Sequence, residues 1–419
     1  MKTLLAAILA LPYMAQAQTP APAEQARSAP EEGIPVTSQL VVSKCGSCHS
    51  KDEHGNLLRI SWERATPEGW EEAIKRMVRL NGVQLAPEEA RSILKYLATY
   101  HGLAPEEARP VMYFAEHRIQ DEANIPTDNI RGACANCHAM AKPLSWRRSS
   151  VDWKLLANLH VALYPQADDA FRLGMRAGRF DEELPKFDPD AKLPVDEALA
   201  HLSKTAPLWT PEWSAWQARM RTPKLAGRWI VTARVPGKGK FYGSMEIEPV
   251  KGTDDEFTTK VKLTSVSDGS TINRAGHSLV YAGYAWRGRS KGSSSTASPD
   301  DLASDAREVL WISPDQSSAE GRWFWGQYQE FGFDVKLQRA SADPMLFEVD
   351  RPSLKTGTQA TRVRLIAENL PAQIAPADLD FGHGVTVRRI VSHSTTELVV
   401  ELDVAVDAVP GKRDVAFHR

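Results

Sequence analysis

Four cysteines, placed in two Cys-x-x-Cys-His pentapeptides, are the residues of this sequence best suited to chemistry. The first pentapeptide covers residues 45–49 and the second covers residues 134–138, and the sequence has no other cysteine. Two thiols three positions apart match the two vinyl groups of a porphyrin, and the histidine that follows can place its imidazole on the iron. The pattern predicts two covalently bound haem c groups, each with two thioether cysteines and a proximal histidine: Cys45, Cys48 and His49, then Cys134, Cys137 and His138.

Other common roles of a single Cys-x-x-Cys pair are to form a disulfide or to supply half of a zinc site. Both alternatives leave the histidine that follows each pair unexplained. Two identical frames with no cysteine left over therefore favour haem over disulfides and zinc.

The first 17 residues have the pattern of a secretory signal peptide. A basic start is followed by an apolar core over residues 4–11 and by Ala15-Gln16-Ala17, a small-x-small cleavage site. The sequence predicts export to the periplasm, with a mature chain that begins near Gln18. No later segment reaches the roughly 18 to 20 consecutive apolar residues of a membrane span, so no membrane span is expected.

The charge balance argues against nucleic acid as a partner. Lys and Arg number 51 and Asp and Glu number 53, which gives a formal charge of −2. No basic run is long enough to follow a phosphate backbone.

Residue patterning changes from helical to strand-like near the middle of the chain. Apolar residues recur at helical spacing up to about residue 200, a Pro-rich stretch follows, and short alternating runs separated by turn residues occupy the rest. We expect an N-terminal all-α dihaem cytochrome c domain followed by all-β domains, namely an antiparallel barrel and an immunoglobulin-like sandwich. The expected bounds are 1–17 for the signal peptide, 18–37 for a flexible leader, 38–205 for the dihaem domain, 225–341 for the barrel-like domain and 343–419 for the immunoglobulin-like domain.

A weak internal repeat indicates the distal iron ligands. After each haem motif a tryptophan is followed seven residues later by a potential ligand, Met77 after Trp70 and His160 after Trp153. Seven residues are about two helical turns, so both members of each pair lie on one helix face. We predict His49/Met77 ligation for the first haem and His138/His160 ligation for the second. Other residues that could serve instead are Met112, Met175, His101 and His117.

The order of a dihaem domain, a barrel-like domain and an immunoglobulin-like domain, with this motif spacing, resembles the large alpha subunit of quinohaemoprotein amine dehydrogenase. The resemblance covers nearly the whole chain and includes the segments 70–77 and 96–103 after the first motif. Members of that family continue into a further β domain, whereas this sequence ends at Arg419, which indicates a shortened relative or an incomplete chain.

The resemblance implies a role in a heterotrimer. A β-propeller subunit and a small subunit with a cysteine tryptophylquinone would build the site that oxidises primary amines to aldehyde and ammonia. The haem subunit would pass the electrons to a soluble blue copper protein or cytochrome c. The chain is thus expected to be the electron-transfer subunit of an oxidoreductase without an amine-oxidising site, and its sequence shows no catalytic constellation.

Two other functions fit two Cys-x-x-Cys-His motifs. A dihaem cytochrome c peroxidase has two such motifs, but it would consist of two cytochrome-like halves without the β half. A dihaem electron carrier for another periplasmic dehydrogenase would differ from the first function only in its partner.

Overall fold

The computed structural model describes residues 33–112, 125–174, 192–293, 302, 304–326 and 331–418. The predicted signal peptide and most of the predicted leader lie outside these residues. Residues Ile34–Arg419 form one compact unit. Among the described helices, none has the length and apolar character needed to cross a membrane.

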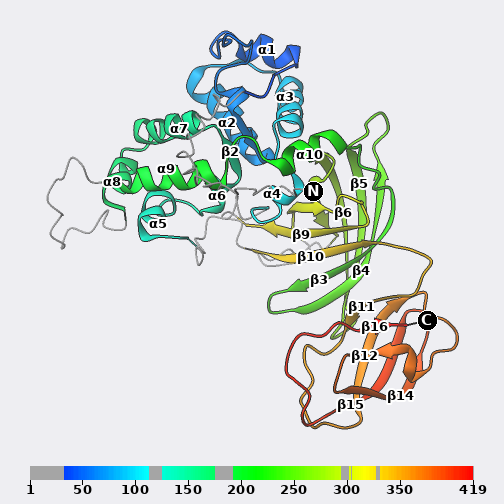
Figure 1. The fold of residues 1–419 in the computed structure, drawn as a ribbon. Coiled ribbons are helices and arrows are strands. Elements are labelled where there is room, and N and C mark those ends of the chain that lie inside the picture. Colours follow the sequence, from blue (N-terminus) through cyan, green and yellow to red (C-terminus); the bar gives the residue numbers. More distant parts are fainter. Residues whose placement is uncertain are drawn as a thin grey trace, which may run out of the picture. The chain divides into compact units, whose positions relative to one another are not determined.

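Helices dominate the first half of the described chain (Figure 1). They group into two lobes, one around each haem motif, and one further helix follows the second lobe. The first lobe contains α1 (Gln39–Cys45), a 3-10 turn (Ile60–Trp62), β1 (Glu63–Ala65), α2 (Pro67–Asn81), α3 (Pro87–Tyr100) and α4 (Pro105–Ala108). The second contains α5 (Asp128–Cys134), α6 (Ala141–Leu144), β2 (Trp146–Arg148), α7 (Ser150–Leu163), α8 (Gln166–Leu173) and α9 (Pro194–Thr205), and α10 (Pro211–Arg219) comes after it.

Local sequence signals fix the ends of α2, the helix with Trp70 and Met77. Thr66 precedes it, and its hydroxyl accepts a hydrogen bond from the Gly69 amide, 3.4 Å away. Pro67 occupies the first helical position, where its missing N–H costs nothing. Gly82 ends the helix with φ +70°, a left-handed conformation that glycine adopts without strain.

The prediction of an all-α N-terminal domain is wrong, because a two-stranded antiparallel sheet joins the two lobes. In it, Glu63 lies opposite Arg148, Arg64 opposite Arg147 and Ala65 opposite Trp146. Every residue of both strands is buried. Strands of three residues that are buried on both faces show no alternation of apolar and polar residues, so periodicity could not reveal them.

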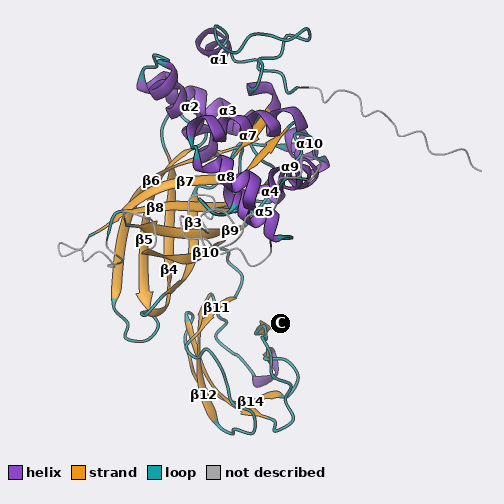
Figure 2. Cartoon of the chain, turned by 90° about the vertical axis from the view of Figure 1, so that its left-hand side faces the viewer, coloured by secondary structure: helices purple, strands orange, loops and turns teal. Residues whose placement is uncertain are grey.

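Eight antiparallel strands close into a barrel after the helices (Figure 2). Each strand pairs with the next in the chain, and β10 pairs back with β3. The strands are β3 (Gly227–Val235), β4 (Gly239–Pro249), β5 (Glu256–Ser265), β6 (Thr271–Tyr281), β7 (Ala285–Gly292), β8 (Ala306–Ile312), β9 (Ser318–Trp325) and β10 (Phe331–Arg339). Burial alternates along β5, as expected when one face of a strand is turned to the interior.

The interior of the barrel is tightly packed where strands β4 and β5 meet. A Cβ atom on Gly243 would lie only 1.7 Å from the backbone oxygen of Lys262, so glycine is required at this position. Large aromatic side chains, among them Trp229, Trp286 and Trp323, are almost completely buried. These tryptophans are therefore core residues of the barrel.

The C-terminal region has its own apolar core, formed around residues such as Val363, Leu398 and Leu402. A four-stranded sheet has the order β11, β12, β15, β14, and a second sheet consists of β13 and β16. The bounds are β11 (Met345–Val349), β12 (Thr361–Glu368), β13 (Leu379–Asp380), β14 (Val385–His393), β15 (Glu397–Val404) and β16 (Ala416–Phe417).

Candidate haem sites

The first haem motif follows directly from the end of α1. The hydroxyl of Ser38 caps the start of this helix by accepting from the amide of Val41. At its end, the amide of His49 donates to the carbonyl of Cys45, 2.9 Å away, which folds the pentapeptide into a helical turn. The His49 Nδ1 atom lies 2.9 Å from the carbonyl oxygen of Leu58. Donation from Nδ1 fixes the ring orientation and leaves Nε2 as the metal-binding atom.

The second motif repeats this arrangement at the end of α5. The hydroxyl of Thr127 caps the helix, and the amide of Ala135 donates to Arg131 at its end. The Nδ1 atom of His138 lies 3.1 Å from the carbonyl oxygen of Ala139. In both motifs the first cysteine is half-buried and the second is exposed, and none of the four forms a disulfide. Burial raises the pKa of the Cys134 thiol to about 11, so this free thiol is protonated at neutral pH.

The two lobes share a structural repeat around their second helices. Each helix starts after a short buried strand and a hydroxyl cap, Thr66 for α2 and Ser149 for α7. The indole N–H of Trp70 donates to the carbonyl of His101, 2.8 Å away, and that of Trp153 donates to Ala206, 3.2 Å away. Both acceptors are the residues that end the next long helix, α3 or α9. Trp70 therefore connects α2 to the end of α3, and Trp153 connects α7 to the end of α9.

The repeat places the two predicted distal ligands at matching positions. Met77 lies eleven residues after the cap Thr66, and His160 lies eleven residues after the cap Ser149. Both side chains are half-buried. The tryptophan and the predicted ligand of each lobe therefore lie on corresponding helix faces.

The structure brings His138 and His160 together. Their ring centroids are 6.5 Å apart. Two imidazoles on opposite sides of a metal, each about 2 Å from it, have ring centres about 6 Å apart. The Nδ1 atom of His160 lies 2.9 Å from the carbonyl of Leu156, so its Nε2 is also left for a metal. Burial lowers the pKa of both histidines, which favours the neutral form that binds iron. These residues fit a haem iron with two histidine ligands.

The side chain of Met77 has one polar contact among the described residues. Its sulfur lies 3.6 Å from the Asn81 amide nitrogen, one turn further along α2. A thioether sulfur that accepts such a weak hydrogen bond still has a lone pair for a metal. The repeat assigns Met77 to the first haem by its correspondence to His160, and its ligation stays a prediction.

The alternative ligands have other surroundings or lie outside the described residues. His101 is fully buried against Trp70 and Tyr96, and burial lowers its pKa to about 4. The repeat places Ala206, which has no metal-binding side chain, at the position that matches His101. Met112 lines a small pocket beside the barrel residues Tyr284 and Trp311. His117 and Met175 lie outside the described residues.

Three family models match consecutive parts of the chain. A model described as "Quinohemoprotein amine dehydrogenase A, alpha subunit, haem binding" matches residues 36–173. Models for domains II and III of the same subunit match residues 222–340 and 344–417. The chain belongs to the quinohaemoprotein amine dehydrogenase alpha subunit family. It is therefore a haem-binding subunit of a multi-subunit oxidoreductase.

Two solved β-barrel structures are similar to part of this chain. A structure titled "De novo design of a fluorescence-activating beta barrel" is 21% identical with a TM-score of 0.21, and the match covers 27% of this chain and 93% of that chain. A redesigned β-barrel is 17% identical with a TM-score of 0.23, and the match covers 28% of this chain and 92% of that chain. No curated protein matched the chain.

A buried ion network connects the two haem lobes of this family member. Arg64 on β1 is fully buried and donates to both carboxylate oxygens of Glu107, over 2.7 and 3.0 Å. Arg147 on β2 donates to the same carboxylate over 3.2 Å. Thr210, the cap of α10, is a third donor at 2.8 Å. One carboxylate therefore holds a strand from each lobe and the helix that leads to the barrel.

A second buried cluster lies on the other side of this strand pair. The guanidinium of Arg148 lies over the rings of Trp146 and Trp153, with 4.2 and 5.6 Å to the ring centroids. It pairs with Glu63, 3.0 Å away, and with Asp152. Glu63 and Arg148 are far apart in the chain, so local sequence patterns do not reveal this buried pair.

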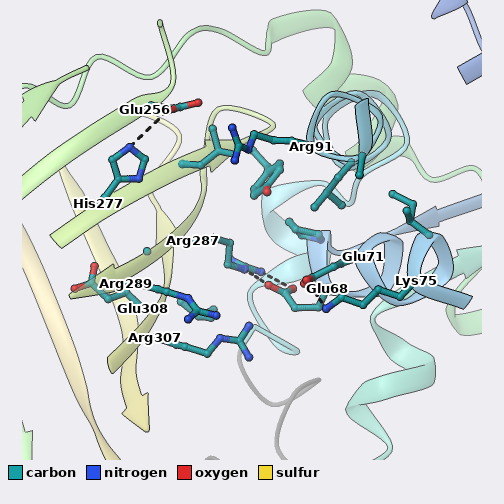
Figure 3. A pocket seen from close by; sticks show the side chains of 18 residues that line it. Glu68, Glu71, Lys75, Arg91, Glu256, His277, Arg287, Arg289, Arg307 and Glu308 are labelled. Carbon is teal, nitrogen blue, oxygen red and sulfur yellow. Dashed lines mark hydrogen bonds and ion pairs between the residues drawn. The ribbon is translucent and has the colours of Figure 1, made fainter. Parts of the chain in front are cut away.

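A cleft of about 800 Å³ lies where α2 and α3 face the outer side of strands β5 to β8 (Figure 3). Its charged residues are mostly paired. Arg287 pairs with Glu68, Lys75 with Glu71, and His277 with Glu256. The cleft shows no nucleophile next to a base, so its described residues give no reason to place amine oxidation there.

Proposed function

We propose that this chain is the dihaem electron-transfer subunit of a periplasmic amine dehydrogenase. The observation that supports the proposal most directly is the facing pair His138 and His160, with a ring separation that suits one iron between them. The matching position of Met77 in the repeat extends the proposal to a second iron on His49.

The chain would hold each cofactor through two cysteines and through histidine or methionine ligands to the iron. Cys45 and Cys48, and their counterparts in the second lobe, would form thioethers with the porphyrin vinyl groups. Hydrogen bonds from Nδ1 to backbone carbonyls would hold the rings of His49 and His138 in the orientation needed to bind iron. Haem c supplies a one-electron couple at each site when it is bound.

The two ligand sets give the sites different electron affinities. A methionine ligand raises a haem potential relative to a histidine ligand. The site of His138 and His160 should therefore be the more reducing one, and electrons should run from it towards the site of His49 and Met77.

The remaining parts of the proposal concern partners and location. A cysteine tryptophylquinone in a small partner subunit, next to a β-propeller subunit, would oxidise primary amines to aldehyde and ammonia and supply the electrons. A soluble blue copper protein or cytochrome c would accept them. The signal-peptide pattern of residues 1–17 supports a periplasmic location.

A dihaem peroxidase is less well supported. Peroxide reduction needs an iron with a distal position that can open, whereas His160 faces His138 from a helix fixed by Trp153. The barrel and the C-terminal sheets also have no role in such an enzyme.

The proposal can be tested with the purified chain and its reconstituted complex. Addition of a primary amine should leave the haem spectrum of the isolated chain unchanged and should reduce both haems once the quinone-bearing subunits are added. A complex with the Cys134→Ala/Cys137→Ala chain, which should bind only one haem, serves as the matched control. Amine-dependent reduction of the isolated chain, or rapid peroxide consumption by it, would contradict the proposal.

A further inference from the structure

Arg76 lies on the face of α2 that is turned towards the second haem lobe. Residues 69, 72 and 76 share this face, since they follow one another by three and four positions. A Cβ atom on Gly69 would lie 2.9 Å from the ring of Trp146, and Glu72 forms a 2.9 Å salt bridge with Lys142. Trp146 and Lys142 both come directly after the second haem motif. A helix of the first lobe thus packs against the segment that follows the second haem motif.

Three cations come from the elements that meet at this contact between the lobes, namely Arg76 of α2, Lys142 of α6 and Arg148 of β2. The charge of Arg76 also acts on the buried carboxylate of Glu63 on β1. The guanidinium of Arg76 therefore lies on the side of α2 that is turned to the strand pair.

Of these three cations, Arg76 has the fewest partners. Arg148 pairs with Glu63 and Asp152, and Lys142 pairs with Glu72. The Nε atom of Arg76 is buried and has no hydrogen-bond partner among the described residues. A buried donor left without an acceptor costs about 1 to 3 kcal/mol, and more when the group is charged. The surroundings therefore favour an anionic ligand at this guanidinium.

We propose that Arg76 binds a carboxylate of the haem attached to Cys134 and Cys137. The inference rests on the proposed function and adds a ligand contact to it. Haem c has two propionate side chains, and a guanidinium can bind a carboxylate through two parallel hydrogen bonds. Because α2 also carries Met77, one helix would contact both cofactors.

The internal repeat makes this contact specific to one haem. Arg76 directly precedes Met77, and the corresponding residue before His160 is Leu159, which cannot bind a carboxylate. A cation beside a haem favours the reduced state, which has one positive charge fewer. Arg76 should therefore raise the potential of the second haem. This makes the difference in potential between the two haems, which arises from methionine and histidine ligation, smaller.

Redox titration of the two haems in Arg76→Gln tests the assignment. One charge at about 10 Å in an effective dielectric constant of about 20 changes an equilibrium constant by on the order of tenfold. At a fixed potential the ratio of reduced to oxidised second haem should fall about tenfold, equivalent to about 59 mV for one electron. The first haem should change much less. In Arg76→Lys the reduction potential of the second haem should stay close to the wild-type value, because lysine keeps the positive charge.

The matched control is Arg79→Gln, which removes an exposed charge from the same helix. Water and salt screen such a charge. At a fixed potential, the ratio of reduced to oxidised form of each haem should therefore stay within about twofold of its wild-type value. Resonance Raman spectra give a second readout, because the propionate bending mode of the second haem should shift in Arg76→Gln and not in Arg79→Gln.

Two outcomes distinguish this inference from the proposed function. Unchanged potentials and an unchanged propionate mode in Arg76→Gln, beside a normal wild-type spectrum, would overturn the Arg76 contact alone. A wild-type protein without a low-spin haem on His138 and His160 would overturn both.

Discussion

Replacement of Glu107 by glutamine should loosen the junction between the two haem lobes. The carboxylate accepts hydrogen bonds from two buried arginines, Arg64 and Arg147, and from the hydroxyl of Thr210. The amide of glutamine carries no charge, and its NH₂ group would face guanidinium donors. Two buried cations would then share one neutral acceptor.

The size of the effect follows from burial. Glu107 is 8% exposed and Arg64 is fully buried, so solvent cannot replace the lost partner. Removal of one member of a buried ion pair costs about 3 to 5 kcal/mol. Because glutamine keeps the shape and one acceptor oxygen, the lower half of that range is expected for Glu107→Gln, and the upper half for Glu107→Ala.

Urea unfolding of the haem-loaded chain, followed by far-ultraviolet circular dichroism, would measure the loss. Glu106→Gln is the control, because Glu106 pairs with Arg219 at the surface, where both side chains are about half exposed. Such exposed pairs contribute about 0 to 1 kcal/mol. If Glu107→Gln costs no more than Glu106→Gln, the ion network does not hold the lobes together.

The effect should also depend on pH. Burial opposes ionisation of Glu107, but the hydrogen bonds and charge of Arg64, with the charge of Arg147, outweigh it and lower the pKa below its ordinary value. An acid with a lowered folded-state pKa contributes its full stability above the unfolded-state value and loses it as pH falls through the folded-state value. The difference between wild type and Glu107→Gln should therefore shrink in acid. A difference that grows towards low pH would refute this reasoning.

Three further predictions concern the haems and the barrel. Met77→Ala should abolish the near-infrared sulfur-to-iron band of one haem and His160→Ala should make the other high-spin, and a sulfur band that survives Met77→Ala would show that another methionine is the ligand. Replacement of both Cys45 and Cys48 by alanine should leave one haem per chain, measured by the pyridine haemochrome assay, whereas full haem retention would exclude covalent attachment there. Burial raises the pKa of Glu308 inside the barrel, so wild-type stability should fall as pH rises from the ordinary glutamate value to the raised one; Glu308→Gln should remove that slope, and an unchanged slope would show that Glu308 is not its source.

The haem motifs could be predicted from sequence because all their determinants are local. Cys45, Cys48 and His49 lie within one helical turn, and the offset from Trp70 to Met77 recurs from Trp153 to His160. The structure explains the recurrence, since each tryptophan donates its indole N–H to the C-terminal end of a later long helix, α3 or α9. Because Trp70 and Trp153 each have such a partner, they occupy equivalent positions in the two lobes.

The parts that escaped prediction depend on contacts between distant residues. Strands β1 and β2 have three residues each, and their pairing joins Glu63 to Arg148 across the second haem motif. The pair of Arg64 and Glu107 is 43 positions apart. Short buried strands with arginines have neither the composition nor the period of a strand, so only tertiary packing determines them.

Closure of the barrel limits the ways in which other subunits can bind. A closed barrel has no unpaired strand edge, so a partner cannot add a strand to β3–β10 and must bind through side chains. In the four-stranded C-terminal sheet, the outer strands are β11 and β14. Strand β14 has two register shifts, and its Arg388 and Arg389 pair with Asp403 and Glu401 of the neighbouring strand. Bulges and charges of this kind discourage edge-to-edge association, which helps to keep unassembled chains from aggregating.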